Sequence, residues 1–355
     1  MRRSSRSYRF ATKLDKRPQV NSATQPAFKQ PPEITEKAQR HPYIAFALRA
    51  GLGVAVVAIL LWHYDARPIF RLLRRESPIF FAAAVVLFLA GQVMSAYRWY
   101  LLARLNHIGG TYREYLAYYF IGMFTNLFVP GLVGGDAARA VYLGRKENRL
   151  GESIASVVAD RGVGLVALFW LAAVCALLLD SSALPANLVD ATLTVGAISF
   201  IGWLASPILG RFATSLGGRL GAFVAPMFAY LRRPPALLPA IALSLILQTS
   251  IVICQYLIAL GLGLHIGLAT FMLIVPIANV AASLPVTLNG LGVREATYVV
   301  LFGMAGVPKT DAIALGLLWF AATMLCGMTG ALAFVTTEVP GPAAAVPASA
   351  TAAVE

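Results

Sequence analysis

The chain has 355 residues, of which 58% are hydrophobic and 13% are charged, and its mean hydropathy is +0.71. Soluble domains carry about 25% charged residues, so this composition excludes an ordinary soluble protein. The formal net charge is +13, and the three cysteines, Cys175, Cys254 and Cys326, lie inside apolar runs. With four scattered histidines and no ligand spacing, the sequence indicates no disulfide framework, metal site or cofactor.

Residues 1–42 are expected to form a disordered, basic tail. They hold ten of the 29 Lys and Arg residues against three acids, and they show almost no periodic apolar pattern. A polybasic segment before a first transmembrane helix is typical of the cytoplasmic side, where it contacts anionic lipid. We therefore expect a cytoplasmic N-terminus and membrane lipids as partners, with no nucleic acid.

Residues 43–335 are expected to form the transmembrane domain of an all-α polytopic membrane protein. Nearly uncharged runs of about 20 residues recur along it, and they do not alternate as barrel strands do. A low-complexity tail, expected to be disordered, follows at 336–355. The sequence thus predicts about eight transmembrane segments, at Tyr43–Leu61, Pro78–Tyr97, Tyr115–Val133, Gly162–Leu179, Leu188–Leu209, Leu237–Leu262, Leu268–Leu288 and Asp311–Val335.

The third run is expected to be re-entrant. If every run crossed the bilayer, the second and third loops would face opposite sides, although both are basic. A segment that enters and turns back at Pro130 places residues near 105 and near 147 on the same, cytoplasmic, side. The basic residues of these two loops are Arg98, Arg104 and Arg113, then Arg139, Arg145, Lys146 and Arg149.

Two segments share one pattern of helix breakers followed by charge, which predicts that both are re-entrant and that they form an internal repeat. Broken backbone in a bilayer is tolerated only beside protein or a water-filled cavity, and helix N-termini at a break favour an anionic ligand. We expect the breaks to meet near mid-membrane about an approximate two-fold axis, with Asp136, Arg139, Arg294 and Glu295 lining a polar path. The first segment contains Pro130, Gly134, Gly135, Asp136 and Arg139, and the second Pro285, Gly290, Gly292, Arg294 and Glu295.

Simpler interpretations remain open for some of these residues. "PGLVGGD" also fits a loop between two ordinary spans with Asp136 as a helix N-cap. Asp160 and Arg161 fit either a capping pair at the entry of a span or a contact with the broken segment. The tyrosines at 112, 115, 118 and 119 are more typical of an aromatic belt than of a binding site.

The sequence resembles the flippase-like membrane proteins related to the N-terminal transmembrane region of lysylphosphatidylglycerol synthase. The resemblance covers about residues 45–335 and rests on "RWYLLAR" from Arg98, "IGMFTNLFVPGLVGGDAARA" from Ile121, "VVADRGVGL" from Val157 and "LPVTLNGLGVREA" from Leu284. The family pattern maps onto Asn126, Pro130, Gly134, Gly135, Asp136, Arg139, Asp160, Arg161, Pro285, Gly290, Gly292, Arg294 and Glu295.

The resemblance implies a protein of the bacterial inner membrane that moves a lipid between leaflets. The lipid is expected to be anionic or phosphate-bearing. A non-catalytic partner of a lipid-modifying enzyme or glycosyltransferase, for example in hopanoid or aminoacyl-lipid synthesis, is the alternative. An enzyme acting on lipid is the third hypothesis, with Asp136, Asp160 and Glu295 as its only carboxylates in place. Lipid-charging members carry a soluble acyltransferase domain that residues 336–355 do not resemble, so no catalysis is expected.

Overall fold

The computed structural model describes residues 71, 74, 76–128, 133–180, 182, 184–212, 226–232, 234–282 and 292–337. The predicted span Tyr43–Leu61, the predicted tail 1–42, and the second tail apart from Thr336 and Thr337 lie outside the described residues. Pro130, Pro285 and Gly290 also lie outside them.

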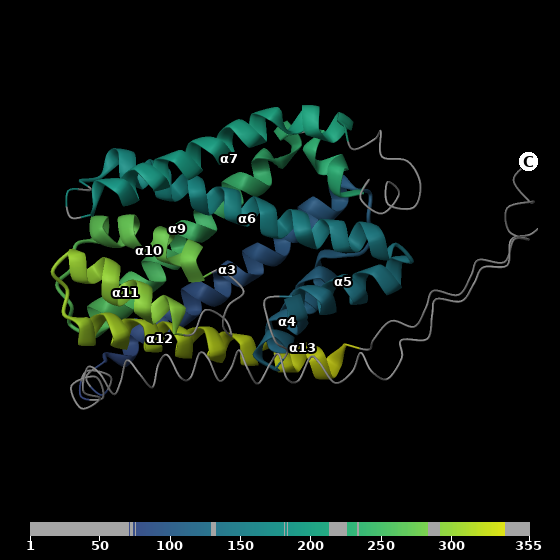
Figure 1. Cartoon of the computed structure of the whole chain (residues 1–355). Coiled ribbons are helices and arrows are strands. Elements are labelled where there is room, and N and C mark those ends of the chain that lie inside the picture. Colours follow the sequence, from purple (N-terminus) through teal and green to yellow (C-terminus); the bar gives the residue numbers. More distant parts are fainter. Residues whose placement is uncertain are drawn as a thin grey trace, which may run out of the picture. The chain divides into compact units, whose positions relative to one another are not determined.

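Every element in the described part is a helix, which confirms the all-α fold class (Figure 1). By length and composition, five helices can cross a membrane: Pro78–Leu105, Leu150–Leu178, Ala186–Ile208, Pro234–Gly261 and Lys309–Thr336. The predicted total of eight segments and the re-entrant course stay predictions. In chain order the helices are α3 (Pro78–Leu105), α4 (Tyr112–Phe128), α5 (Val133–Glu147), α6 (Leu150–Leu178), α7 (Ala186–Phe212), the 3-10 helix η3 (Pro234–Leu237), α9 (Leu238–Gly261), α10 (Leu268–Ala282), α11 (Val293–Met304), α12 (Lys309–Met328) and α13 (Gly330–Thr336).

Helix α3 packs antiparallel along α9. The backbone N–H of Ser77, just before α3, donates to the carbonyl of Gly261 at the end of α9 at 3.0 Å. Further along, Nη1 of Arg98 donates to Oγ of Ser244 at 2.8 Å. The end of α3 and the start of α9 therefore lie at the same end of the helix bundle.

Helices α4 and α5 form an antiparallel hairpin, which we call the first hairpin. Lys146 near the end of α5 pairs with Glu114 near the start of α4, and the rings of Tyr118 and Tyr142 lie 5.4 Å apart. The helices approach most closely at Gly135, where a Cβ atom would lie 2.0 Å from the carbonyl oxygen of Gly122. Only glycine allows this approach, so the glycine pair sets how tightly the hairpin closes.

Helices α10 and α11 form a second hairpin. The rings of Phe271 near the start of α10 and Phe302 near the end of α11 lie 5.0 Å apart. Helix α11 begins after Gly292, whose φ of 83° is in the left-handed region that favours glycine. The Glu295 carboxylate accepts a hydrogen bond from the Gly292 N–H at 2.5 Å, which caps this helix start.

The two hairpins lie toward opposite ends of α6 (Figure 1). The open end of the first hairpin, where α4 begins and α5 ends, lies beside the start of α6. There Arg149, just after α5, donates to the carbonyl of His107, just before α4, at 2.7 Å. Ala176, near the end of α6, instead belongs to the apolar cluster that contains Phe271 and Phe302. The two hairpins therefore open toward different ends of α6, and the internal repeat stays a prediction.

Glycines recur where these helices meet. A Cβ on Gly330 of α13 would lie 2.0 Å from the Phe120 carbonyl oxygen of α4, and one on Gly316 of α12 would lie 2.8 Å from Cγ of Glu295. Lipid tails are as apolar as leucine, so helices in a membrane associate through close packing of this kind. The glycines thus fix the positions of both hairpins against α12 and α13.

Candidate functional site

Three arginines and two aspartates from three helices form one connected ion network. Asp160 of α6 is shared: its Oδ1 lies 2.8 Å from Nε of Arg98 on α3, and its Oδ2 lies 3.0 Å from Nη1 of Arg139 on α5. Asp136 of α5 lies 2.9 Å (Oδ1) from Nη2 of Arg139 and 2.6 Å (Oδ2) from Nε of Arg161 on α6. We call these five residues the Asp160 network.

Asp160 is the centre of the network and is only 1% exposed. A carboxylate so deeply buried requires cationic partners, because desolvation of an unpaired charge costs several kcal/mol. Arg98 also donates to Ser244 at 2.8 Å. The network therefore joins the first hairpin to α3, α6 and α9.

Arg139 is held on all sides and is 3% exposed. Its Nε donates to Asp136 Oδ1 at 3.1 Å and its Nη1 to Asp160 Oδ2 at 3.0 Å. The guanidinium also lies 4.9 Å from the centre of the Trp99 ring and 5.1 Å from that of Tyr119. In this conformation Arg139 positions the two aspartates and presents no open face to a ligand.

Arg161 is the accessible cation of the network. Its side chain is 49% exposed, although Nε and Nη2 both donate to Asp136, at 2.6 and 3.1 Å. No charged residue follows it between Gly162 and Leu178. Arg161 thus lies at the boundary between the polar first part of α6 and the apolar remainder of this candidate span.

The network carries one net positive charge, because three guanidinium groups face two carboxylates. The residual charge is best placed on Arg161, since Asp160 balances much of the charge of Arg98 and Arg139. A partly exposed guanidinium held by one carboxylate binds a phosphate or carboxylate through two parallel N–H groups. The arrangement therefore favours an anionic ligand on the Arg161 side.

Asn126 and Gly135 have structural roles in the hairpin. Oδ1 of Asn126 on α4 accepts the N–H of Gly135 at 2.7 Å, which satisfies a donor in the first turn of α5. Gly134 precedes it and is half-buried. Asp136 lies in that first turn, where the helix dipole stabilises negative charge. This helix start is therefore already occupied in part by protein groups.

The alternative of a capping pair at Asp160 and Arg161 is wrong. Helix α6 begins at Leu150, not near Gly162, so both residues lie well inside it. Their contacts are instead with α5, directly after the broken segment. The aromatic-belt interpretation is wrong for Tyr115 and Tyr118, which are buried in a cluster with Trp99.

Arg98 is a site residue that lies in a helix and not in the loop expected from the sequence. Helix α3 continues to Leu105, so Arg98 is inside it and buried. The signal was its position between an apolar run and "WYLLA", which continues the helix. An arginine in such a place needs a buried acid, and Asp160 supplies it.

The second segment places Gly292, Arg294 and Glu295 at the start of α11. Arg294 is 7% exposed and Glu295 is 0% exposed. Nearby, Tyr298 donates to Oε1 of Gln255 on α9. The predicted meeting of this segment with Asp136 and Arg139 in one polar path stays a prediction.

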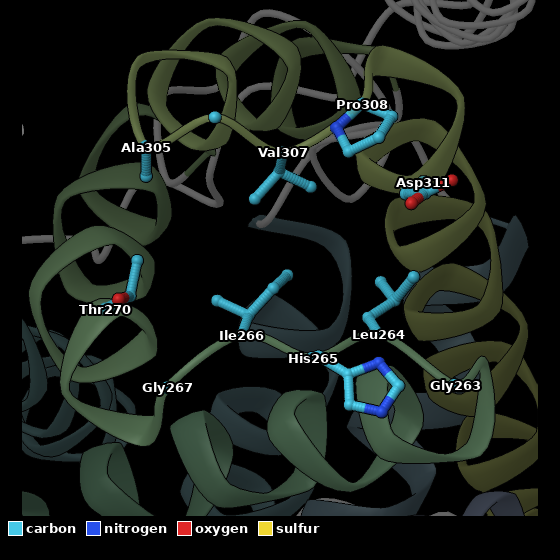
Figure 2. A pocket seen from close by; sticks show the side chains of 11 residues that line it. Gly263, Leu264, His265, Ile266, Gly267, Thr270, Ala305, Val307, Pro308 and Asp311 are labelled. Atoms are coloured by element: carbon cyan, nitrogen blue, oxygen red, sulfur yellow. The ribbon is translucent and has the colours of Figure 1, made fainter.

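A pocket of about 390 Å³ lies at the end of α9 and contains no predicted site residue. Figure 2 shows Leu264, Ile266 and Val307 around the same space, with Asp311 at its edge. It is lined by the loops 263–267 and 305–308 and is separate from the Asp160 network. Its lining contains the carboxylate of Asp311 and no Lys or Arg, so it does not favour an anionic ligand.

The fold and the network define a class: an all-helical, multi-pass membrane protein whose helical hairpin carries a buried ion network. The family model described as "Lysylphosphatidylglycerol synthase TM region" matches residues 46–330, and the chain belongs to this family. It is 25% identical to a UPF0104 membrane protein of Pyrococcus horikoshii over 302 residues, 75% of this chain and 89% of that protein. It is 24% identical to a UPF0104 membrane protein of Methanothermobacter thermautotrophicus, over 74% of this chain and 87% of that protein. No solved structure matches the chain.

Proposed function

We propose that the protein moves an anionic or phosphate-bearing lipid between the leaflets of the cytoplasmic membrane, without catalysing a reaction. The observation that carries the proposal is Arg161, which is 49% exposed within a network of net positive charge at the edge of an apolar span. An arginine exposed to hydrocarbon is unfavourable, and an anionic headgroup removes that cost by pairing with it.

Asp136 acts as the counter-ion of Arg161 when no lipid is bound. Two N–H groups of Arg161, on Nε and Nη2, donate to this carboxylate, at 2.6 and 3.1 Å. A lipid phosphate offers the same bidentate geometry, so it replaces Asp136 without leaving a buried charge unpaired. Arg139 keeps Asp136 in place through the exchange, because it holds the same carboxylate at 2.9 Å.

The second hairpin would provide the other half of the path. Arg294 and Glu295 follow its break as Asp136 and Arg139 follow the first, and both are buried. We propose that Arg139 and Arg294 are both important for lipid movement. For Arg139 the contacts support a positioning role rather than direct contact with the lipid.

The contacts of the carboxylates support a non-catalytic role. Asp160 is engaged by two arginines and Asp136 by two, and Glu295 is 0% exposed. General acid-base chemistry at a membrane surface needs a carboxyl group that reaches the substrate. Among the described residues the carboxylate that contacts Arg161 is Asp136, and Arg139 also holds it at 2.9 Å, which keeps it engaged rather than free to transfer a proton.

The test is lipid movement by the purified full-length chain in proteoliposomes. Fluorescent phosphatidylglycerol in the inner leaflet becomes accessible to a membrane-impermeant quencher only when it crosses the bilayer. We expect faster movement than in protein-free vesicles, and a smaller effect on a labelled lipid with an uncharged sugar headgroup. A rate equal to that of empty vesicles would contradict the proposal and favour a non-catalytic partner of a lipid-modifying enzyme.

A further inference from the structure

A second group of basic side chains lies outside the Asp160 network, where α3 ends and α6 begins. It lines a pocket of about 380 Å³ whose walls include Asn106, His107, Arg149, Tyr230 and Arg232. A pocket of this volume is large enough for a small polar ligand or headgroup.

Arg149 is fixed in the pocket by protein contacts. Its Nη1 donates to the His107 carbonyl at 2.7 Å, and its Nε donates to Oε1 of Glu152 at 3.2 Å. Glu152 also lines the pocket and balances one of its two guanidinium charges. The lining thus keeps one net positive charge when His107 is neutral, and Arg149 is already ordered without a ligand.

Arg232 is the residue best placed to bind an anion. Among the described residues its one hydrogen bond runs from Nε to the Gly210 carbonyl, at 3.2 Å. This bond orients the guanidinium. It leaves the two terminal nitrogens, which form the fork that binds phosphate, available to a ligand. The Tyr230 hydroxyl donates to the Leu102 carbonyl at 3.0 Å, so Tyr230 forms a fixed wall beside it.

The pocket lies where headgroups are expected. Its lining includes Leu105 at the end of α3 and Arg149 just before α6, and both helices are candidate membrane spans. Seven residues, two helical turns or about 10 Å, separate Leu105 from Arg98 on the same side of α3. The pocket is therefore near the Asp160 network but closer to the membrane surface.

We propose that this pocket binds the phosphate group of a membrane lipid through Arg232, with Arg149 as the second cation. The proposal rests on the proposed function in one respect, which is that the lipid headgroup binds in this pocket before the headgroup reaches Arg161. Basic pockets between transmembrane helices are suited to lipid phosphates in the adjoining leaflet. A free phosphate ion has the same chemistry, so the experiment includes both.

The experiment is calorimetric titration of the full-length chain in a sugar-based detergent that contains no phosphate. The probes are a short-chain phosphatidylglycerol and inorganic phosphate. All proteins carry Arg161→Gln, which removes the exposed cation of the Asp160 network. Arg232→Gln is compared with Arg145→Gln, because Arg145 is an exposed arginine on α5 that does not line the pocket.

We expect Arg232→Gln to weaken binding of the lipid about tenfold or more, as loss of a charge-assisted hydrogen bond does, and Arg145→Gln to leave it unchanged. Binding of the lipid alone identifies a headgroup site, and parallel loss for inorganic phosphate identifies phosphate as the group recognised. Equal affinities for the Arg232→Gln and Arg145→Gln proteins, both eluting as folded protein, would overturn the inference. Lipid movement is a separate readout, so failure of the proposed function leaves this result interpretable.

Discussion

Arg139 and Asp160 form a buried ion pair of 3.0 Å between α5 and α6. Arg139 follows the broken segment, whereas Asp160 belongs to a continuous candidate span. The pair therefore fixes the returning half of the first hairpin against a helix that crosses the bundle. It also explains why an acid and a base directly follow the Pro and Gly residues of this segment.

Replacing Asp160 with asparagine should strongly destabilise the protein. The amide keeps one neutral acceptor and turns an N–H donor toward the other arginine, so either Arg98 or Arg139 loses its partner and both lose the compensating charge. Breaking one side of a buried ion pair costs about 3–5 kcal/mol. We expect a large loss of monodisperse protein extracted from membranes. The control is Asp190→Asn on α7, where the side chain is exposed, and equal yields of the two variants would contradict this role.

Gly135→Ala should prevent closure of the first hairpin. The new Cβ would lie 2.0 Å from the Gly122 carbonyl oxygen, so the helices must separate. Overpacking of this kind costs about 1–3 kcal/mol or more. Gly162→Ala on α6 is the matched control, because nothing lies within 4 Å of its Cβ position. We expect a lower unfolding temperature for the first variant alone, and equal temperatures would mean that the contact is not required.

Much of the fold could be predicted from the sequence, because long apolar runs identify transmembrane helices. Asp136 and Arg139 are three residues apart, a spacing at which an acid and a base can pair on a helix, and they form an ion pair of 2.9 Å. Arg98 could not be assigned in this way, because its partner Asp160 lies 62 residues away. The early start of α6 had a usable signal, a buried polar stripe at Ser153, Ser156 and Asp160 with helical spacing.

The re-entrant course predicts that Asn106 and Asn148 are accessible from the same side of the membrane. Arg149 contacts the backbone of His107, so the two loops are neighbours in the fold. The measurement uses single cysteines at the two positions in a chain without Cys175, Cys254 and Cys326. In intact cells, a membrane-impermeant maleimide should label neither, and in inverted vesicles it should label both. Labelling of the two from opposite faces would contradict the re-entrant course.

Glu76 should make stability depend on pH. It precedes α3, and burial beside Gly261 raises the pKa of its carboxyl group to about 7. The folded protein then binds the proton more tightly than the unfolded chain, so stability is fully present below about pH 4.5 and is lost as pH rises through 7. We expect the unfolding temperature, measured at intervals of about one pH unit, to fall between pH 5 and pH 8. Glu76→Gln should reduce this fall. An identical pH profile for the variant would refute the assignment.

The most direct test of the central claim is the rate of phosphatidylglycerol movement in proteoliposomes for Arg161→Gln compared with Arg145→Gln. Arg161 is the exposed cation of the Asp160 network, whereas Arg145 is exposed on α5 outside it. Loss of a charge-assisted contact with the phosphate predicts movement about ten- to hundredfold slower for Arg161→Gln. Arg145→Gln should match the wild-type chain, at equal amounts of folded protein for all three. Wild-type movement by the folded Arg161→Gln protein would contradict the claim that this network handles the lipid headgroup.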